Sequence, residues 1–165
     1  MPDQPKKVRA LTRAAVFAAL YAVLTALSAV LNLAFGAVQL RFSEALCVLP
    51  LLFPEAAWGT AIGCFLANVI SPYGPLDLLV GPAATLLAGV LTASCRRPAL
   101  APLPPVVCNA VLVGAVIAWE ETGTSAAFLP AFAYHALTIG AGEALVCYAL
   151  GLPLLHFLRR RAEAK

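Results

Sequence analysis

Long apolar stretches, separated by short polar or Pro/Gly-rich breaks, make up almost the whole chain. They do not alternate with polar residues at a period of two, as the strands of a membrane barrel would, and irregular backbone cannot face lipid. The pattern therefore predicts an all-α integral membrane protein. Spans are expected at residues 11–33, 41–53, 56–70, 76–93, 106–119 and 128–158.

The second expected span is short, because an apolar part of about ten residues makes roughly 15 Å of helix against a hydrocarbon core of ~30 Å. The positions of the basic residues determine how the stretch 44–72 is divided. One span there gives five crossings and places the Arg-rich ends on opposite sides, whereas two spans divided at Pro54-Glu55 give six crossings. Six crossings place all the basic clusters on one side, which the positive-inside rule makes cytoplasmic.

Composition agrees with a membrane protein, since 62% of the residues are apolar and 12% are charged, against roughly 25% charged residues in soluble domains. Residues 1–165 are therefore expected to form a single domain in the lipid bilayer of the cell membrane, with both termini in the cytoplasm. No ATP-binding motif is evident, and no cleavable signal peptide is expected. Ten of the eleven basic residues form three clusters: Lys6, Lys7, Arg9 and Arg13; Arg96 and Arg97; and Arg159, Arg160, Arg161 and Lys165.

The eleventh basic residue, Arg41, falls on the opposite side, three residues before Glu44 and after an outer loop that includes Gly36. Two roles are open for its guanidinium. It recognises a carbonyl oxygen of a ligand, or it pairs with Glu44 and holds the outer loop closed. We expect the second role, because Ser43-Glu44 at a helix start suits N-terminal capping.

Polar side chains within the expected spans indicate a binding site, because a charge there is costly unless it faces a cavity or a partner. Glu143 is the clearest case, since it lies more than ten residues from either end of its span. Asn109 comes to a similar depth, so the two side chains are expected to line one pocket. The other candidates, most of them closer to the outer surface, are Arg41, Glu44, Asn68, Tyr73, Asp77, Glu120, Tyr134 and His135.

Several of these candidates also have a simpler explanation. The alternatives are interhelical hydrogen bonding for Asn68 and Asn109, packing for His135, helix capping for Asp77, and a place in the interfacial aromatic belt for Tyr73 and Tyr134. The five cysteines have no metal-ligand spacing, so no metal site is expected. No nucleophile motif is present either, so the chain is not expected to be an enzyme.

The first expected span carries a ladder of small residues at every fourth position, Ala14, Ala18, Ala22 and Ala26. Small residues at this spacing let a second helix approach closely, which is how helices associate in lipid. Alanine is abundant throughout the chain, so a chance alignment is the alternative. The ladder therefore predicts a docking face for a partner helix.

The outer stretch 38–46, with the sequence VQLRFSEAL and Leu49-Pro50 after it, resembles the signature of the QueT family. The resemblance covers about residues 10–158. Further matches come in order at Ile62-Gly63-Cys64 to Ala67-Asn68, Ser71-Pro72-Tyr73-Gly74 to Asp77, Leu103-Pro104-Pro105 to Asn109, Gly142-Glu143 to Cys147-Tyr148, and Gly151-Leu152-Pro153.

This resemblance implies an S component, the substrate-binding subunit of an energy-coupling factor (ECF) transporter, with six helices and both ends in the cytoplasm. It implies one transmembrane coupling protein and two ATPase subunits as partners, and a docking role for the alanine ladder. ATP is then used by the partners, so no cofactor is expected on this chain, and no nucleic acid partner. The implied substrate is a queuosine precursor, a 7-deazaguanine base in a form such as aminomethyl or cyano.

The candidate residues suit such a base. Glu143 or Asp77 would accept the paired N–H groups of a guanine-like edge, Asn109 and Asn68 would match a donor with an acceptor, Tyr73 or Tyr134 would stack on the ring, and Glu44, Asp77 or Glu120 would attract an aminomethyl cation. Three alternatives stay open on the sequence: an S component for another nutrient such as a vitamin, a solitary proton-coupled carrier that uses Glu143, and a membrane scaffold without transport.

Overall fold

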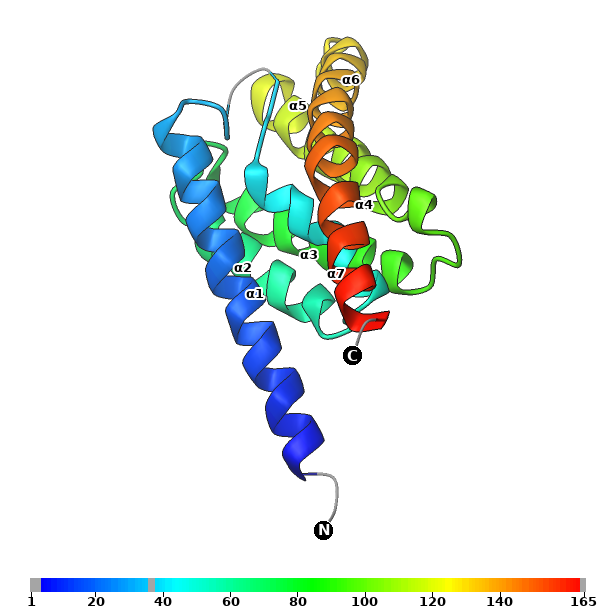
Figure 1. The fold of residues 1–165 in the computed structure, drawn as a ribbon. Coiled ribbons are helices and arrows are strands. Elements are labelled where there is room, and N and C mark those ends of the chain that lie inside the picture. Colours follow the sequence, from blue (N-terminus) through cyan, green and yellow to red (C-terminus); the bar gives the residue numbers. More distant parts are fainter. Residues whose placement is uncertain (1–3, 36–37, 164–165) are drawn as a thin grey trace.

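The computed structural model describes residues 4–35 and 38–163, and throughout these residues the secondary structure is helical (Figure 1). The all-α prediction is therefore confirmed for the described residues. The elements are α1 (Gln4–Val30), the 3₁₀-helix η1 (Phe42–Leu51), α2 (Ala56–Asn68), α3 (Gly74–Ala93), the short 3₁₀-helix η2 (Pro98–Leu100), α4 (Leu103–Cys108), the π-helix η3 (Asn109–Val113), α5 (Gly114–Thr122), α6 (Phe128–Val146), the π-helix η4 (Cys147–Gly151) and α7 (Leu152–Glu163).

Four helical segments of the described chain are long and apolar enough to cross a membrane: Lys6–Val30, Gly74–Ala93, Pro98–Thr122 and Phe128–Arg161. The third joins α4, η3 and α5 without a break, and the fourth joins α6, η4 and α7. The expected spans at 41–53 and 56–70 correspond to η1 and α2, each of which makes only about 20 Å of helix. The six-crossing topology therefore stays a prediction.

Helix η1 lies inside the bundle rather than against lipid. Every residue from Ser43 to Pro50 is buried, and η1 packs against α1, α2, α3 and η4. A 3₁₀-helix of this length is uncommon because its hydrogen bonds are poorly aligned. Here the surrounding helices keep lipid away from its backbone, which is the condition for irregular backbone at membrane depth.

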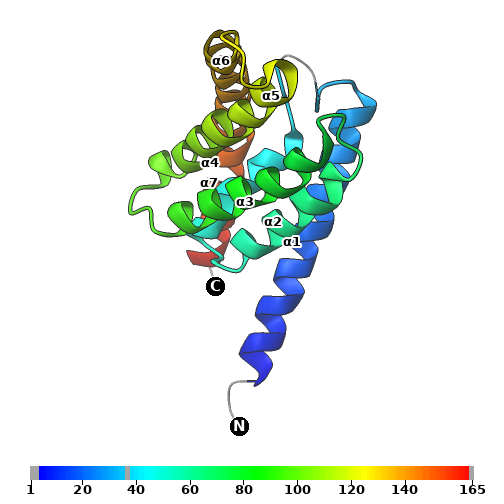
Figure 2. The same cartoon turned by 180° about the vertical axis from the view of Figure 1, so that it is seen from behind.

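Helix α1 begins and α7 ends towards the same end of the bundle, and the first turns of α1 project beyond the other helices (Figures 1 and 2). The α5–α6 connection lies at the opposite end. This arrangement agrees with the expected placement of both termini on one side. The assignment of that side to the cytoplasm rests on the positive-inside rule, and Lys165 and Gly36, used in the sequence argument, lie outside the described residues.

Helices α1 and α2 pack closely because α2 presents two glycines to the α1 backbone. A Cβ atom on Gly59 would lie 2.5 Å from the carbonyl oxygen of Ala14, and one on Gly63 would lie 2.6 Å from that of Ala18. Two rungs of the alanine ladder therefore contact a helix of the same chain. Towards its C-terminal end, Ala22 is half-buried and Ala26 is exposed. An apolar groove of about 340 Å³ runs beside this contact, lined by Leu11, Ala14, Ala15, Ala18, Ala19, Ile62 and Leu66.

Two helix ends differ from the sequence expectation for local reasons. Helix α1 stops at Val30, because Asn32 adopts φ 57° and the Leu33 amide donates to the Ser28 carbonyl at 2.8 Å, a left-handed end that asparagine tolerates. Helix α3 begins at Gly74, so Asp77 lies within its first turns and is not its N-cap. The capping interpretation of Asp77 was therefore wrong.

The prolines of the last segment act differently from one another. Pro130 lies in the first turn of α6. Backbone N–H groups there have no partner within the helix, so the N–H that proline lacks costs no hydrogen bond. Pro153 follows η4, and its ring displaces the carbonyl four residues earlier, at Ala149. The π-turn of η4 thus directly precedes Pro153, whereas α6 continues past Pro130 without a break.

Candidate functional site

A small polar cavity lies in the centre of the bundle, between the strap Val38–Arg41, η1, α2, α3, η3 and α6. Its free volume is about 10 Å³, enough for about one water molecule. Four of the candidate residues line it. The lining residues are Gln39, Arg41, Glu44, Cys64, Gly81, Thr85, Asn109, Val113, Ile139 and Glu143.

Glu143 and Asn109 meet in this cavity, as their similar depths predicted. The Asn109 side-chain amide donates to Glu143 Oε1, and the Cys147 thiol lies 3.6 Å from Glu143 Oε2. Both side chains are about 5% exposed. Asn109 begins η3, and η4 begins one turn after Glu143, so each partner lies beside a π-turn, a geometry that recurs at functional sites.

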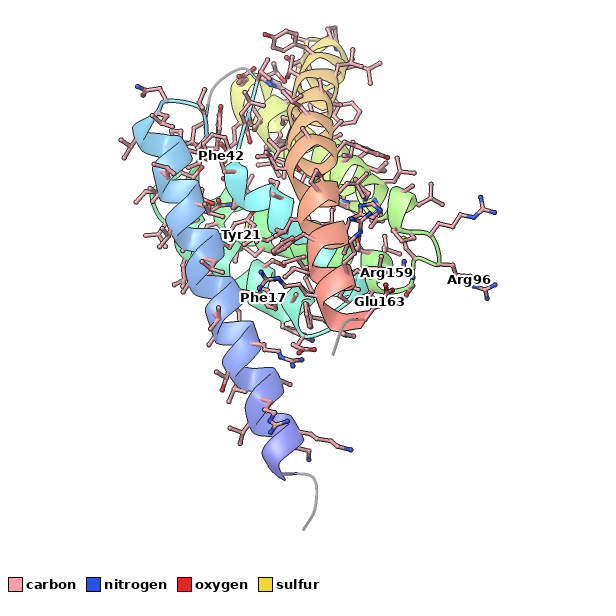
Figure 3. All side chains as sticks on the ribbon, in the orientation of Figure 1. Phe17, Tyr21, Phe42, Arg96, Arg159 and Glu163 are labelled. Atoms are coloured by element: carbon pink, nitrogen blue, oxygen red, sulfur yellow. The ribbon has the colours of Figure 1, made fainter. Side chains whose placement is uncertain are left out.

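The second buried carboxylate, Glu44, is held by its neighbours on α1 and η1. Tyr21 reaches from α1 into the bundle (Figure 3) and its hydroxyl donates to Glu44 Oε1. The Cys47 thiol lies 3.1 Å from Glu44 Oε2. Tyr21 was missed at the sequence level, although Tyr21, Thr25 and Ser28 form a polar stripe at i, i+4 and i+7 on an otherwise apolar helix.

The rest of that stripe holds the start of η1. The Phe42 amide donates to Ser28 Oγ at 3.0 Å, and the Thr25 hydroxyl donates to Ser43 Oγ at 2.8 Å. The residue before η1, Arg41, makes no side-chain capping bond. The expectation that Ser43-Glu44 caps this helix was therefore wrong, because Ser28 on α1 supplies the oxygen atom that accepts the hydrogen bond from the first amide.

Arg41 is fully enclosed and is held by three groups. Its Nε donates to the Ala34 carbonyl at 3.2 Å, its Nη1 donates to Asn68 Oδ1 at 3.4 Å, and the guanidinium lies 5.1 Å from the centre of the Phe35 ring. The ion pairs of the described residues do not include one between Arg41 and Glu44. Arg41 thus ties the outer loop to α2, and the expected pairing with Glu44 is not formed.

Asn68 and Asp77 lie behind Arg41 and support it. The Asn68 amide donates to the Asp77 carbonyl at 3.0 Å, and the Ser71 hydroxyl donates to Asp77 Oδ2 at 2.6 Å. Gly81 makes room for the Asn68 amide, since a Cβ atom there would lie 2.4 Å from Asn68 Nδ2. Asn68 therefore forms the interhelical hydrogen bond that was one of its two interpretations.

Tyr73 closes the outer side of the site. It is half-buried, and its hydroxyl donates to the Phe35 carbonyl at 2.9 Å, so it anchors the same loop segment that carries the ring under Arg41. Burial raises the pKa of this hydroxyl above its ordinary value, which keeps it protonated and able to donate. Tyr73 contacts the strap region rather than the cavity itself.

Three further candidates lie away from the cavity. His135 is buried against α5, with its Nε2 atom 2.8 Å from Glu121 Oε2, so it acts as an interface histidine. Glu120 is exposed beside Gly74. Tyr134 is 53% exposed on the outer surface of α6. None of these three side chains lines the cavity in this conformation.

Gln39 lines the cavity but was missed at the sequence level. It is 6% exposed, and its backbone carbonyl packs against α6, where a Cβ atom on Gly142 would lie 2.1 Å from that oxygen. The strap is extended, so residues two apart point to one side. Gln39 lies two residues before Arg41, and that spacing is the signal that could have identified it.

The cavity thus has complementary walls. Glu143 and Glu44 supply carboxylate oxygens that accept hydrogen bonds, and Arg41 and Gln39 supply N–H groups that donate them. Such an arrangement, enclosed by apolar helices, suits a small polar molecule rather than lipid. Among the described residues, no cluster of three or more His, Cys, Asp or Glu side chains is arranged to hold a metal ion.

The sequence model of the family described as "QueT transporter" matches residues 11–160. The chain belongs to the QueT transporter family. No curated protein and no solved structure is significantly similar to the chain. As a QueT transporter the protein is a membrane protein that moves a small molecule, which agrees with an enclosed polar site among membrane-length helices.

Proposed function

We propose that this QueT transporter is the substrate-binding S component of an ECF importer and captures a queuosine precursor, a 7-deazaguanine base, at the outer face. A transmembrane coupling protein and two ATPase subunits would complete the importer and supply the energy from ATP. The observation that carries the proposal is the central cavity, where the carboxylates of Glu143 and Glu44 face the donors of Arg41 and Gln39.

The chemistry of the base matches these walls. A guanine-like edge presents two adjacent N–H donors beside a ring carbonyl. Glu143 accepts the paired N–H groups while Asn109 holds the carboxylate in place, because a carboxylate has several acceptor positions. Glu44, which also lines the cavity, attracts the aminomethyl cation in precursors that carry one.

The size of the cavity implies a lid. Small-molecule pockets have volumes of about 300 Å³ or more, whereas the free volume here is about 10 Å³. A base therefore enters only when the strap Val38–Arg41 lifts from α6. In this proposal the described conformation is the closed one.

A thermal-shift panel tests the substrate class. Purified protein is heated in detergent with the aminomethyl or cyano 7-deazaguanine, riboflavin, thiamine or biotin, because a ligand that binds the folded state raises the melting temperature by mass action. We expect a shift with the deazaguanines alone. Glu143→Gln should remove the shift, while Glu163→Gln, on the exposed end of α7, should keep it. A shift with a vitamin and none with a deazaguanine would assign the protein to another nutrient.

A solitary proton-coupled carrier is the second candidate, favoured by the two buried carboxylates that share the cavity. The two functions differ in their need for partners. We expect uptake of labelled base to be lost in cells that lack the coupling ATPases. Uptake that persists there, and that Glu143→Gln abolishes, would identify the carrier instead.

A further inference from the structure

Two buried donors on the strap have no hydrogen-bond partner among the described residues. They are Gln39 Nε2 and Arg41 Nη2. Both residues are 6% exposed, and both line the central cavity. Buried polar side chains are almost always hydrogen-bonded, so the acceptor for these two donors is either the one water molecule that the cavity can hold or, once the strap lifts, a ligand.

The protein itself holds these donors in place without satisfying them. Arg41 is fixed by the Ala34 carbonyl, by Asn68 and by the Phe35 ring, which leaves Nη2 free. Gln39 is fixed through its backbone, which packs against Gly142 on α6. An acceptor that enters when the strap lifts would therefore meet two donors that the protein leaves unpaired.

Glu143, which lines the same cavity, has the reverse polarity. As a carboxylate it donates no hydrogen bond, and only its Oε1 atom has a strong donor, the Asn109 amide. The contact of its Oε2 atom is the Cys147 thiol at 3.6 Å, a weak donor. The cavity lining thus combines unpaired donors with a carboxylate oxygen that can accept.

We propose that Gln39, together with Nη2 of Arg41, recognises the ring carbonyl of the ligand and so selects a cyclic amide over an analogue with an amino group at that position. This inference rests on the proposed function, since it assumes that the cavity binds a 7-deazapurine. A cyclic amide places its carbonyl oxygen against Gln39 and its adjacent N–H groups against Glu143. An amino group in place of the carbonyl would set donor against donor, which a site built for one hydrogen-bonding pattern rejects.

The test compares 7-deazaguanine with 2,6-diamino-7-deazapurine, in which an amino group replaces the ring carbonyl and the adjacent ring nitrogen carries no hydrogen. We expect the wild-type protein to bind the first roughly tenfold to a hundredfold more tightly. Gln39→Glu replaces the donor by an acceptor and should reduce this preference, while the part that comes from the ring N–H against Glu143 should remain. Thr124→Glu is the matched control, because it adds the same charge on an exposed residue of the α5–α6 connection, away from the cavity lining, and it should keep the preference.

Gln39→Met separates recognition from a structural role. It removes a buried donor that has no partner, so the melting temperature without ligand should stay the same or rise, while affinity for 7-deazaguanine should fall about tenfold. A lower ligand-free melting temperature with unchanged affinity would overturn the inference, as would an unchanged ligand preference in Gln39→Glu. If the wild-type protein binds neither base, the proposed function fails as well. If it prefers 7-deazaguanine and Gln39→Glu keeps the same preference, only the inference about Gln39 fails.

Discussion

At the scale of single residues, Tyr21 shows how a buried carboxylate is made tolerable in an apolar bundle. The Glu44 side chain is 3% exposed, and the Tyr21 hydroxyl is its strongest donor, with the Cys47 thiol a weaker second. A carboxylate deprived of donors in such a place is costly to bury. Tyr21 therefore acts on the site from α1, although it does not line the cavity.

Tyr21→Phe should destabilise the protein by about 1–3 kcal/mol, because it leaves one oxygen of Glu44 buried without a donor. The measurement is unfolding in detergent, followed by temperature or denaturant. Tyr148→Phe removes the same atom from a side chain that is 38% exposed and should change stability little. Equal stability of both variants would show that Glu44 does not depend on the hydroxyl.

The sequence predicted a contact of the site where two residues lie at the same depth in neighbouring helices. It did not predict a contact that depends on the course of a loop. Glu143 and Asn109 meet because two helices at one depth bring them together. The pairing of Arg41 with Glu44 was expected from an i, i+3 spacing, which applies only within a helix. Arg41 instead lies in extended backbone with φ −92° and ψ 112°, so its guanidinium turns towards Asn68.

At the scale of elements, α1 and α2 pack closely because α2 has glycines, which carry no side chain, at the contact. Gly59 and Gly63 are four residues apart, so both lie on one face of α2, and that face rests on the backbone of α1 at Ala14 and Ala18. In lipid, close packing of this kind replaces the hydrophobic drive that holds soluble helices together. The two glycines thus position the helix that carries Asn68.

Gly63→Ala should destabilise the bundle by roughly 1–3 kcal/mol, the usual range for a methyl group forced into a packed contact. Its Cβ would lie 2.6 Å from the Ala18 carbonyl oxygen and 2.6 Å from Tyr21 Cβ. Gly140→Ala on α6 is the control, since its Cβ would meet only Ala110 Cβ at 3.3 Å. Thermal unfolding of both variants checks this, and a stable Gly63→Ala protein would contradict the close contact.

The elements themselves were predicted unevenly. The four long apolar segments were recognisable, because hydrophobic length is the signal that a bilayer imposes. The end of α1 and the start of α3 were misplaced because single residues with positive φ, Asn32 and Gly74, mark them. The 3₁₀ form of η1 had no sequence signal, since burial by neighbouring helices, rather than local preference, permits it.

At the scale of the whole molecule, the charges and the fold agree on one arrangement. The basic residues of α1 and α7 lie towards one end of the bundle, and Arg96 projects sideways from the α3–α4 connection (Figure 3). The opposite end carries Glu120 and Glu121 at the end of α5. Retention of basic loops in the cytoplasm would then set the orientation of the protein.

Cysteine labelling tests this orientation in whole cells. Ser125→Cys, in the exposed connection between α5 and α6, should react with a membrane-impermeant maleimide from outside. Arg96→Cys should react only after the cells are permeabilised. Both changes are made in a Cys95→Ser background, because Cys95 is the native cysteine of the inner connection. Labelling of Arg96→Cys in intact cells would invert the topology.

The buried position of η1 has a consequence for how the chain is made. The membrane insertion machinery releases a segment into lipid when that segment is stable there alone, and a ten-residue 3₁₀-helix is too short to be so. We therefore expect η1 to stay with the insertion machinery, or in water, until α1, α3 and the last segment have entered the bilayer around it. The central element of the binding site would then be the last to take its place, after chain segments that are synthesised later.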